Sequence, residues 1–526
     1  MRIAVVSWMY GSAWTVLVSG IQLKTFARLL GFSDFDFGLL AAVPPVATMF
    51  MLLAAVLIER TGLRKYQFLE FGTVHRLLWL LIAAIPLAFM VPSRQAVWMM
   101  LLVYSVSWVM HSFAAPAWTT WMGDIVPKRI RGRFFATRFG FGRLIQIVLV
   151  VGIGILLDEI TLPMEAGQVE SVENQPYLLW ATMGIFAVAA LLGATEILMY
   201  RKVRDIMPRP TEDQERPHQV YIPRPKRWTP FSAIGFGGLY VHRFLAEVLV
   251  EPMKDPVFRN YVKYGFTVAF ATSVPGFFFW VYTTESLGFS KLAANVLYMV
   301  ISPILGMIGL QVWGRLLDRW GRRPVLMVST GMTVFSVTPY FFTTRHTPAP
   351  QFVLDACNWI AAHVGPMVGK GGDWVWLTSD MPIGAFLLVS ISVTIGGIGW
   401  TGVMMGQNNF MLAFSDSKGR SRYVAAAQVL VSLGAVIGAP VGGLLVWGLG
   451  AMNWNALAVG PFIWLPYHAT FALSCASRIL ALIWLINLPD PGAGKVRDMI
   501  RYMGLITYSN LSSWVLFPVR VLKHKK

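Results

Sequence analysis

Apolar segments long enough to cross a lipid bilayer recur along the whole chain of 526 residues. Their apolar positions run on continuously and lack the periods of 3.6 or 2 residues that mark half-buried helices and strands. A bilayer core requires about 20 apolar residues per helix, and an open sheet would leave backbone groups unpaired there. The pattern predicts helical spans in the first half of the chain at 5–30, 34–58, 67–92, 96–122, 134–157 and 178–200. It predicts further spans in the second half at 259–284, 291–313, 325–344, 383–410, 423–449 and 469–488.

These twelve spans predict an all-α polytopic membrane protein built from two six-helix bundles. The first bundle covers 1–200 and the second covers 259–488. Between them, 201–258 reads as a polar, proline-rich linker that ends in an amphipathic helix, and 489–526 forms a tail. Composition agrees, because 56% of the residues are hydrophobic and only 13% are charged, whereas a soluble protein carries about 25% charged residues.

The net charge of +18 lies mainly in alternate connections between the spans. Lys and Arg follow spans two, four and ten, fill the linker and end the tail, whereas 158–177 contains neither. Because short connections rich in Lys and Arg stay on the cytoplasmic side of a membrane, the pattern predicts cytoplasmic N- and C-termini. It disfavours nucleic-acid binding, which requires a basic face on a folded soluble module.

The second half of the chain repeats landmarks of the first. ERTGLRK at 59–65 aligns with DRWGRRP at 318–324, and each copy ends the second span of its half. RGRFFA at 131–136 aligns with RSRYVA at 420–425, and each follows a fourth span of its half. Two matched landmarks in the same order indicate a duplicated bundle. Duplicated bundles of this kind form transporters whose ligand site lies between the halves near the middle of the membrane.

The stretch GRLLDRWGRR at 314–323 resembles the loop signature of the major facilitator superfamily, Gly-x-x-x-Asp-Arg-x-Gly-Arg-Arg/Lys. The first-half copy departs from it, because Ala55, Glu59 and Leu63 replace the leading Gly, the Asp and one Arg. DIVPKRIRGRFFATR at 124–138 resembles the matching loop of bacterial members of uncertain substrate. The resemblance implies a transporter of the bacterial inner membrane that moves a small molecule by alternating access.

We interpret the charged turns as a conformational latch between the bundles. Gly321 permits a tight reversal between two helices, and Gly314 would let backbones approach closely. Asp318 could accept hydrogen bonds from an Arg or from a helix N-terminus of the other bundle. The predicted latch residues are Glu59, Arg60, Gly62, Arg64, Asp124, Arg131, Arg133, Gly314, Asp318, Arg319, Gly321, Arg322, Arg323 and Arg420. The alternative interpretation treats them as interfacial anchors and topology signals only.

The resemblance also implies that spans one, four, seven and ten line the substrate cavity. The residues predicted to line it, together with one arginine of span twelve, are Ser12, Thr15, Ser19, Gln22, Tyr104, Trp108, His111, Trp280, Thr401, Asn408 and Arg478. This aromatic and mostly neutral set suits an amphipathic or aromatic molecule, although helix packing alone would also explain it. Arg478 could bind an anionic group or pair with a carbonyl. His111 could couple protons to transport or stay neutral in a hydrogen bond.

Other classes of function find little support in the sequence. No nucleotide-binding loop of the form Gly-x-x-x-x-Gly-Lys-Ser/Thr occurs, and no cluster has metal-ligand spacing. We therefore predict no catalytic residue, no metal and no cofactor. The rival to a secondary transporter is a non-transporting subunit with the same fold, which would use the linker and the tail to contact a protein partner in a membrane complex.

Overall fold

The computed structural model describes most of the chain. The described residues are 2–51, 53–54, 57–58, 63–126, 131–160, 175–203, 205, 249–364, 382–414, 420–452, 454, 456–459, 462–490 and 492–504. The predicted amphipathic segment at 241–249 lies almost wholly outside them, as does the tail beyond residue 504.

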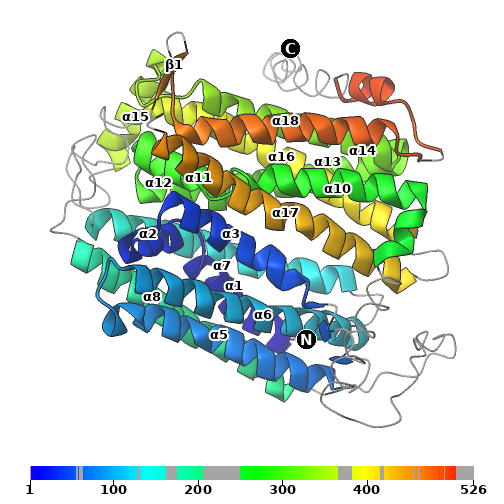
Figure 1. Cartoon of the computed structure of the whole chain (residues 1–526), viewed down its shortest axis with the longest axis horizontal. Coiled ribbons are helices and arrows are strands. Elements are labelled where there is room, and N and C mark those ends of the chain that lie inside the picture. The colour runs from blue at the N-terminus through cyan, green and yellow to red at the C-terminus, as the bar shows by residue number, and fades with distance from the viewer. Residues whose placement is uncertain are drawn as a thin grey trace, which may run out of the picture.

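Within the described residues, six membrane segments form the first bundle, which occupies the lower part of Figure 1. The first segment is bent by 45° between its two helices, and the break contains Gly20. The helices of this bundle are α1 (Arg2–Leu17), α2 (Ile21–Leu30), α3 (Asp34–Thr48), α5 (Arg64–Ala88), α6 (Arg94–Ile125), α7 (Arg131–Ile160) and α8 (Gln175–Met199), followed by η3 (Tyr200–Lys202).

The second bundle repeats this order in the upper part of Figure 1. Its first two segments each contain a π-helical stretch, which is η6 in one and η7 in the other. They comprise η5 (Pro252–Lys254), α10 (Pro256–Ser273), α11 (Phe278–Val281), η6 (Tyr282–Ser286), α12 (Lys291–Asn295), η7 (Val296–Ile301) and α13 (Ser302–Trp320). The others are α14 (Arg322–Val337) with η8 (Thr338–Phe341), α16 (Ile383–Phe414), α17 (Arg420–Ala451) and α18 (Pro466–Ile486).

The predicted twelve-helix architecture is confirmed by this arrangement. Nine helices in the described part of the chain are long and apolar enough to cross a membrane, and the bent pair α1–α2 makes up to ten. Helices α3 and α14 have 15 and 16 residues, fewer than the roughly 20 that a straight helix needs to cross the bilayer core. They nevertheless lie within the bundles beside longer helices (Figure 1).

The two ends of the molecule differ in the elements that they carry. Figure 1 places α2, α12, α15 (Gln351–Val364) and β1 (Leu457–Val459) at the left end. We call this the outer end, because the charge pattern predicts that it faces outside. We call the opposite end, where α18 finishes and α10 begins, the inner end.

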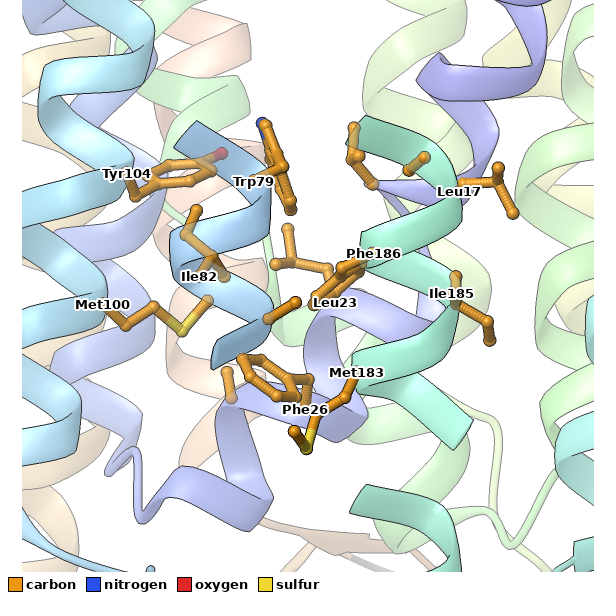
Figure 2. Close-up of a cluster of buried hydrophobic side chains, with 14 of the residues drawn as sticks. Leu17, Leu23, Phe26, Trp79, Ile82, Met100, Tyr104, Met183, Ile185 and Phe186 are labelled. Atoms are coloured by element: carbon orange, nitrogen blue, oxygen red, sulfur yellow. The ribbon is translucent and has the colours of Figure 1, made fainter. Parts of the chain in front are cut away.

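Aromatic packing fills the centre of the first bundle. Figure 2 shows Phe26, Trp79 and Phe186 from α2, α5 and α8 directed toward one another. The ring of Phe186 lies 5.0 Å from that of Phe26 and 5.2 Å from that of Trp79, between centroids, and both contacts are edge-to-face. Buried aromatic pairs in this geometry stabilise a core beyond the area that they bury. They hold α2, α5 and α8 in fixed relative positions.

Backbone-to-backbone contact joins the two bundles along α3 and α17. A Cβ atom at Gly38 would lie 2.8 Å from the carbonyl oxygen of Ala439 and 3.0 Å from the Cα of Gly443. Small residues at both positions allow this approach, as is common between membrane helices. On another side of α17, Gly434 packs against backbone atoms of α10.

Three features of the second bundle differ from the predicted pattern. The long connection near 345–382 contains α15, which is too short to register as a span. A two-stranded antiparallel hairpin, β1 with β2 (Phe462–Trp464), precedes α18. The predicted span at 259–284 is present as one apolar span, Pro256–Ser286, but its helix breaks between α10 and α11, at the position of Pro275 and Gly276, because proline cannot donate a helical hydrogen bond.

Candidate functional site

Charged side chains join the two bundles at the outer end. Lys24 Nζ of α2 lies 2.6 Å from Glu285 Oε1 of η6, and Arg28 Nε lies 3.0 Å from the same oxygen. Arg28 also pairs with Asp34 at 2.6 Å, and Lys24 Nζ donates to Thr284 Oγ1 at 3.2 Å. We call Lys24, Arg28, Asp34 and Glu285 the outer gate, because their contacts connect the first bundle to the second.

A second contact between the bundles lies beside the outer gate. Asp158, near the end of α7, accepts hydrogen bonds from the backbone N–H groups of Lys291 at 2.7 Å and Leu292 at 3.0 Å. These groups belong to the first turn of α12, where helical N–H groups lack partners within the helix. The N–H of Ile21, at the break between α1 and α2, donates to Asn295 Oδ1 at 3.4 Å. The outer ends of the two bundles are therefore held together.

At the inner end, the charged turn between α13 and α14 is tied to its own bundle. Gly321 has a φ of 86°, which favours glycine and confirms the predicted reversal. Asp490, whose side chain is 3% exposed, accepts from the N–H groups of Arg322 at 2.8 Å and Arg323 at 2.9 Å. It also pairs with the guanidinium of Arg322 at 3.0 Å. Asp490 therefore anchors the N-terminus of α14 to the end of α18.

The chain that follows Asp490 packs on the same turn. The Arg319 guanidinium lies 4.2 Å from the ring centre of Tyr502, within the helical stretch 496–504. Gly494 N–H donates to the carbonyl of Trp320 at 2.9 Å. Asp318 is exposed and has no hydrogen bond or ion pair with any described residue. The latch role of Asp318 stays a prediction.

The structure describes the side chains or backbone of only some of the other predicted latch residues. For Gly314, the expected close backbone approach is wrong in this conformation, because among the described residues an added Cβ would meet only Met405 Cε, at 3.8 Å. Arg64 begins α5 at the inner end. The remaining positions lie outside the described residues or have side chains that are not described, and they are Glu59, Arg60, Gly62, Asp124, Arg131, Arg133 and Arg420.

A buried ion pair lies inside the first bundle. Arg76 Nη2 of α5 lies 2.6 Å from Glu196 Oε2 of α8, and the two side chains are 9% and 5% exposed. The guanidinium of Arg76 also lies 3.5 Å from the ring centre of Trp14 on α1. Because a charge in a membrane span is costly unless it is paired, this contact couples three helices of the bundle.

Aromatic and imidazole rings surround this ion pair. His75 Nδ1 lies 2.8 Å from the carbonyl oxygen of Ser107, and since a carbonyl only accepts, Nδ1 carries the hydrogen. The His75 ring lies 5.0 Å from that of His111 and 5.1 Å from that of Trp14. Trp108 contacts His111 at 5.2 Å. The predicted face of α6 therefore joins the Arg76 ion pair in one polar, aromatic centre.

The second bundle buries its own arginine. Arg478 of α18 is 2% exposed and donates through Nη1 to the carbonyl of Thr333 and, at 3.3 Å, to Ser336 Oγ, both on α14. Its guanidinium lies 5.4 Å from the ring centre of Trp400 on α16. The predicted pairing with a carbonyl is present. These contacts lie within the second bundle, so the structure does not bring Arg478 together with Trp108 and His111.

The remaining predicted cavity residues occupy varied surroundings. Trp280 packs 4.7 Å from Tyr298 and against the core of the first bundle. Asn408 is exposed and Thr401 is buried. Thr15, Ser19 and Gln22 donate hydrogen bonds to backbone carbonyls of their own segment. Ser12 and Tyr104 are buried.

Sequence reasoning missed several of these groups, although a signal was present. Lys24, Arg28 and Arg76 interrupt segments that are otherwise apolar, and Glu285 and Asp158 stand at the ends of spans. A charge in such a place requires a partner. The sequence marks these residues as candidates, but only the fold shows which cation meets which carboxylate.

Comparisons with known proteins agree with this architecture. A family model described as Major Facilitator Superfamily matches residues 3–355. A comparison with curated protein sequences finds no match. Among solved structures, a point-mutant form of the nucleoside transporter NupG is similar at 12% identity and a TM-score of 0.55, covering 93% of this chain and 99% of that one.

Two further structures share the fold. A D-xylose-proton symporter is similar at 11% identity and a TM-score of 0.55, covering 94% of this chain and 98% of that one. A bacterial homologue of the human lysosomal transporter Spinster is similar at 14% identity and a TM-score of 0.50, covering 93% of this chain and 94% of that one. Identities this low show the fold alone. Because the family model spans more than half of the chain, the protein belongs to the Major Facilitator Superfamily and is a membrane transporter rather than an enzyme.

Proposed function

We propose that the chain moves a small amphipathic or aromatic molecule across a bacterial inner membrane by alternating access, with both termini in the cytoplasm. The observation that carries this proposal is the outer gate. Lys24 and Arg28 of the first bundle share the carboxylate of Glu285 in the second, so the bundles are closed against each other at the outer end. In an alternating-access cycle, this arrangement is the inward-facing state.

The state of the charged turn supports the same proposal. In an inward-facing state, a latch at the inner end must be open, and Asp318 is exposed without a described partner. Closing the inner end would bring the cytoplasmic ends of the bundles together and give Asp318 its acceptor role. The outer gate and the Asp318 latch would then stabilise opposite states, which is how differential contacts shift a two-state equilibrium.

The chemistry of the first bundle supports an aromatic or amphipathic substrate. Trp14, Trp108 and His111 provide flat, polarisable surfaces beside the Arg76 ion pair. Aromatic rings bind apolar bodies by stacking, and indole N–H groups fix one polar end. A sugar phosphate would bring negative charge that Arg76 is not free to balance, because Arg76 is already paired with Glu196.

The proposal predicts that Asp318→Asn favours the inward-facing state. A hydrogen bond to a charged group contributes about 1.5–3 kcal/mol, so its loss should shift a balanced equilibrium by roughly 10- to 150-fold. Cysteine introduced at Asn408, which is exposed in this conformation, should react faster with an impermeant thiol reagent in inside-out vesicles. Arg315→Ala is the matched control, because Arg315 is exposed in the same turn. Unchanged reactivity in a well-folded Asp318→Asn protein would show that the turn has no latch role and serves only as a topology signal.

The same variants separate the transporter from its rival. A non-transporting subunit has no need of a second state, so neither substitution should change the accessibility of residue 408. A stable co-purifying protein, together with no thermal stabilisation by any member of a small-molecule library, would favour the subunit. Stabilisation by an aromatic or amphipathic compound would support transport.

A further inference from the structure

Each bundle buries an arginine between its third and sixth segments, and the first bundle buries a second one, Arg138 of α7. In the first bundle, Arg76 lies between α5 and α8, which are its third and sixth segments. In the second bundle, Arg478 lies between α14 and α18, again the third and sixth segments. The two bundles repeat in sequence, so these arginines occupy equivalent seams of a duplicated fold.

The two seams differ in how the positive charge is balanced. Arg76 has the carboxylate of Glu196 at 2.6 Å. Arg478 donates to a backbone carbonyl and to the hydroxyl of Ser336 and lies over the face of Trp400, and no carboxylate of the described residues pairs with it. Its Nε has no hydrogen-bond partner among the described residues. Carbonyl and hydroxyl oxygens carry only partial charges, so they do not neutralise a guanidinium.

We propose that Arg478 is the binding site of an anion, either the carboxylate of an organic molecule or a halide ion such as chloride. The guanidinium presents a planar set of N–H donors that pairs with a carboxylate through two hydrogen bonds, and the free Nε is one of them. The guanidinium lies 5.4 Å from the ring centre of Trp400, so an organic anion bound to Arg478 would lie close to this indole. This proposal does not rest on the proposed transport cycle, because binding is measured on the purified protein without transport.

The first test is ligand-induced thermal stabilisation of the purified protein, followed by its tryptophan fluorescence. At fixed ionic strength in a sodium HEPES buffer, chloride and benzoate are titrated separately, with benzyl alcohol as the uncharged counterpart of benzoate. At least one anion should raise the unfolding midpoint in a saturable way, whereas benzyl alcohol should not.

Substitutions assign the effect to the arginine. Arg478→Gln should weaken the apparent affinity about 10- to 150-fold, as expected for the loss of a hydrogen bond to a charged group. Arg259→Gln, which changes an exposed arginine of the same bundle, should leave it unchanged. Should Arg478→Gln fail to fold, Trp400→Phe keeps the guanidinium and should weaken benzoate more than chloride.

A second readout leaves the site intact. Cys475 is partly buried, free and one helical turn before Arg478 on α18. In a Cys357→Ser background, the bound anion should slow the reaction of Cys475 with N-ethylmaleimide. Protection by chloride alone would identify an inorganic anion, and protection by benzoate alone an organic one. The proposal is wrong if neither anion shifts the unfolding midpoint or slows the labelling of Cys475. It is also wrong if the anions stabilise Arg478→Gln as much as they stabilise the unchanged protein.

Discussion

Glu196→Gln should lower the free energy of unfolding of the first bundle by about 3–5 kcal/mol, the cost of removing one partner from a buried ion pair. The substitution keeps the shape of the side chain but leaves Arg76 as an unpaired charge beside Trp14. Unfolding of the purified protein by a denaturing detergent, followed by tryptophan fluorescence, would measure the change. Glu70→Gln is the matched control, because Glu70 is exposed on α5 and its loss should change stability by no more than about 0.5 kcal/mol.

The double variant Arg76→Leu with Glu196→Leu separates charge from packing. Replacing a buried ion pair with apolar side chains of similar volume is often close to neutral, because both desolvation costs disappear together. We expect the double variant to be more stable than Glu196→Gln alone. If the Glu196→Gln protein were as stable as the unchanged protein, the charge of Arg76 would not require Glu196. The ion pair would then not stabilise the polar centre of the first bundle.

Asp490→Ala should release the charged turn from the end of α18. The carboxylate accepts two backbone hydrogen bonds and the guanidinium of Arg322, and each hydrogen bond to a charged group contributes about 1.5–3 kcal/mol. We expect a loss of stability of about 3 kcal/mol, less than the sum of these contributions because the partly exposed Arg322 can bind water instead, measured in the same detergent titration. Cysteine at Tyr502, which packs on Arg319, should also become more reactive.

Two variants define which contacts of Asp490 matter. Asp490→Asn retains an oxygen for the N–H groups of Arg322 and Arg323 but places an amide NH₂ toward the guanidinium, so it should cost less than Asp490→Ala. Asp498→Ala removes an exposed carboxylate from the neighbouring helical stretch and should have little effect. Equal stability of Asp490→Ala and Asp498→Ala would show that the turn is held by chain connectivity alone.

The spans and the duplication were predictable from sequence because both depend on local pattern. Twenty apolar residues require a helix in lipid whatever surrounds them, and Gly321 marks a reversal by its own conformational freedom. The limits of α3 and the break before α11 were less predictable, since prolines within a span permit either a bend or a stop. The helix α15 was missed because it is shorter than a span and lies in a connection.

The candidate site was only partly predictable, for a different physical reason. Tyr104, Trp108 and His111 share one face of a single helix, so spacing alone brings them together. The partners of Arg28, Arg76 and Asp490 lie on other segments, and their pairing depends on how the bundles pack. Local sequence shows that a buried charge requires a partner, but it does not say which one.

The central claim is that the outer gate closes one side of a protein that alternates between two states. Double electron–electron resonance between spin labels at exposed positions tests it, after both native cysteines are replaced by serine. Labels at Ala88 and His346 measure the distance between the bundles at the outer end, and labels at Lys202 and Lys495 measure it at the inner end. Labels at Ala88 and Tyr177 measure a distance within the first bundle as a control. The perturbation is Glu285→Gln, which removes the carboxylate that Lys24 and Arg28 share.

Alternating access predicts a reciprocal change. In Glu285→Gln, a population with a longer 88–346 distance should appear together with a shorter 202–495 distance, while the 88–177 distance stays the same. The contradicting result is an inner distance that stays constant or lengthens as the outer ends separate, because the outer gate would then be a static clamp between two bundles that do not exchange states.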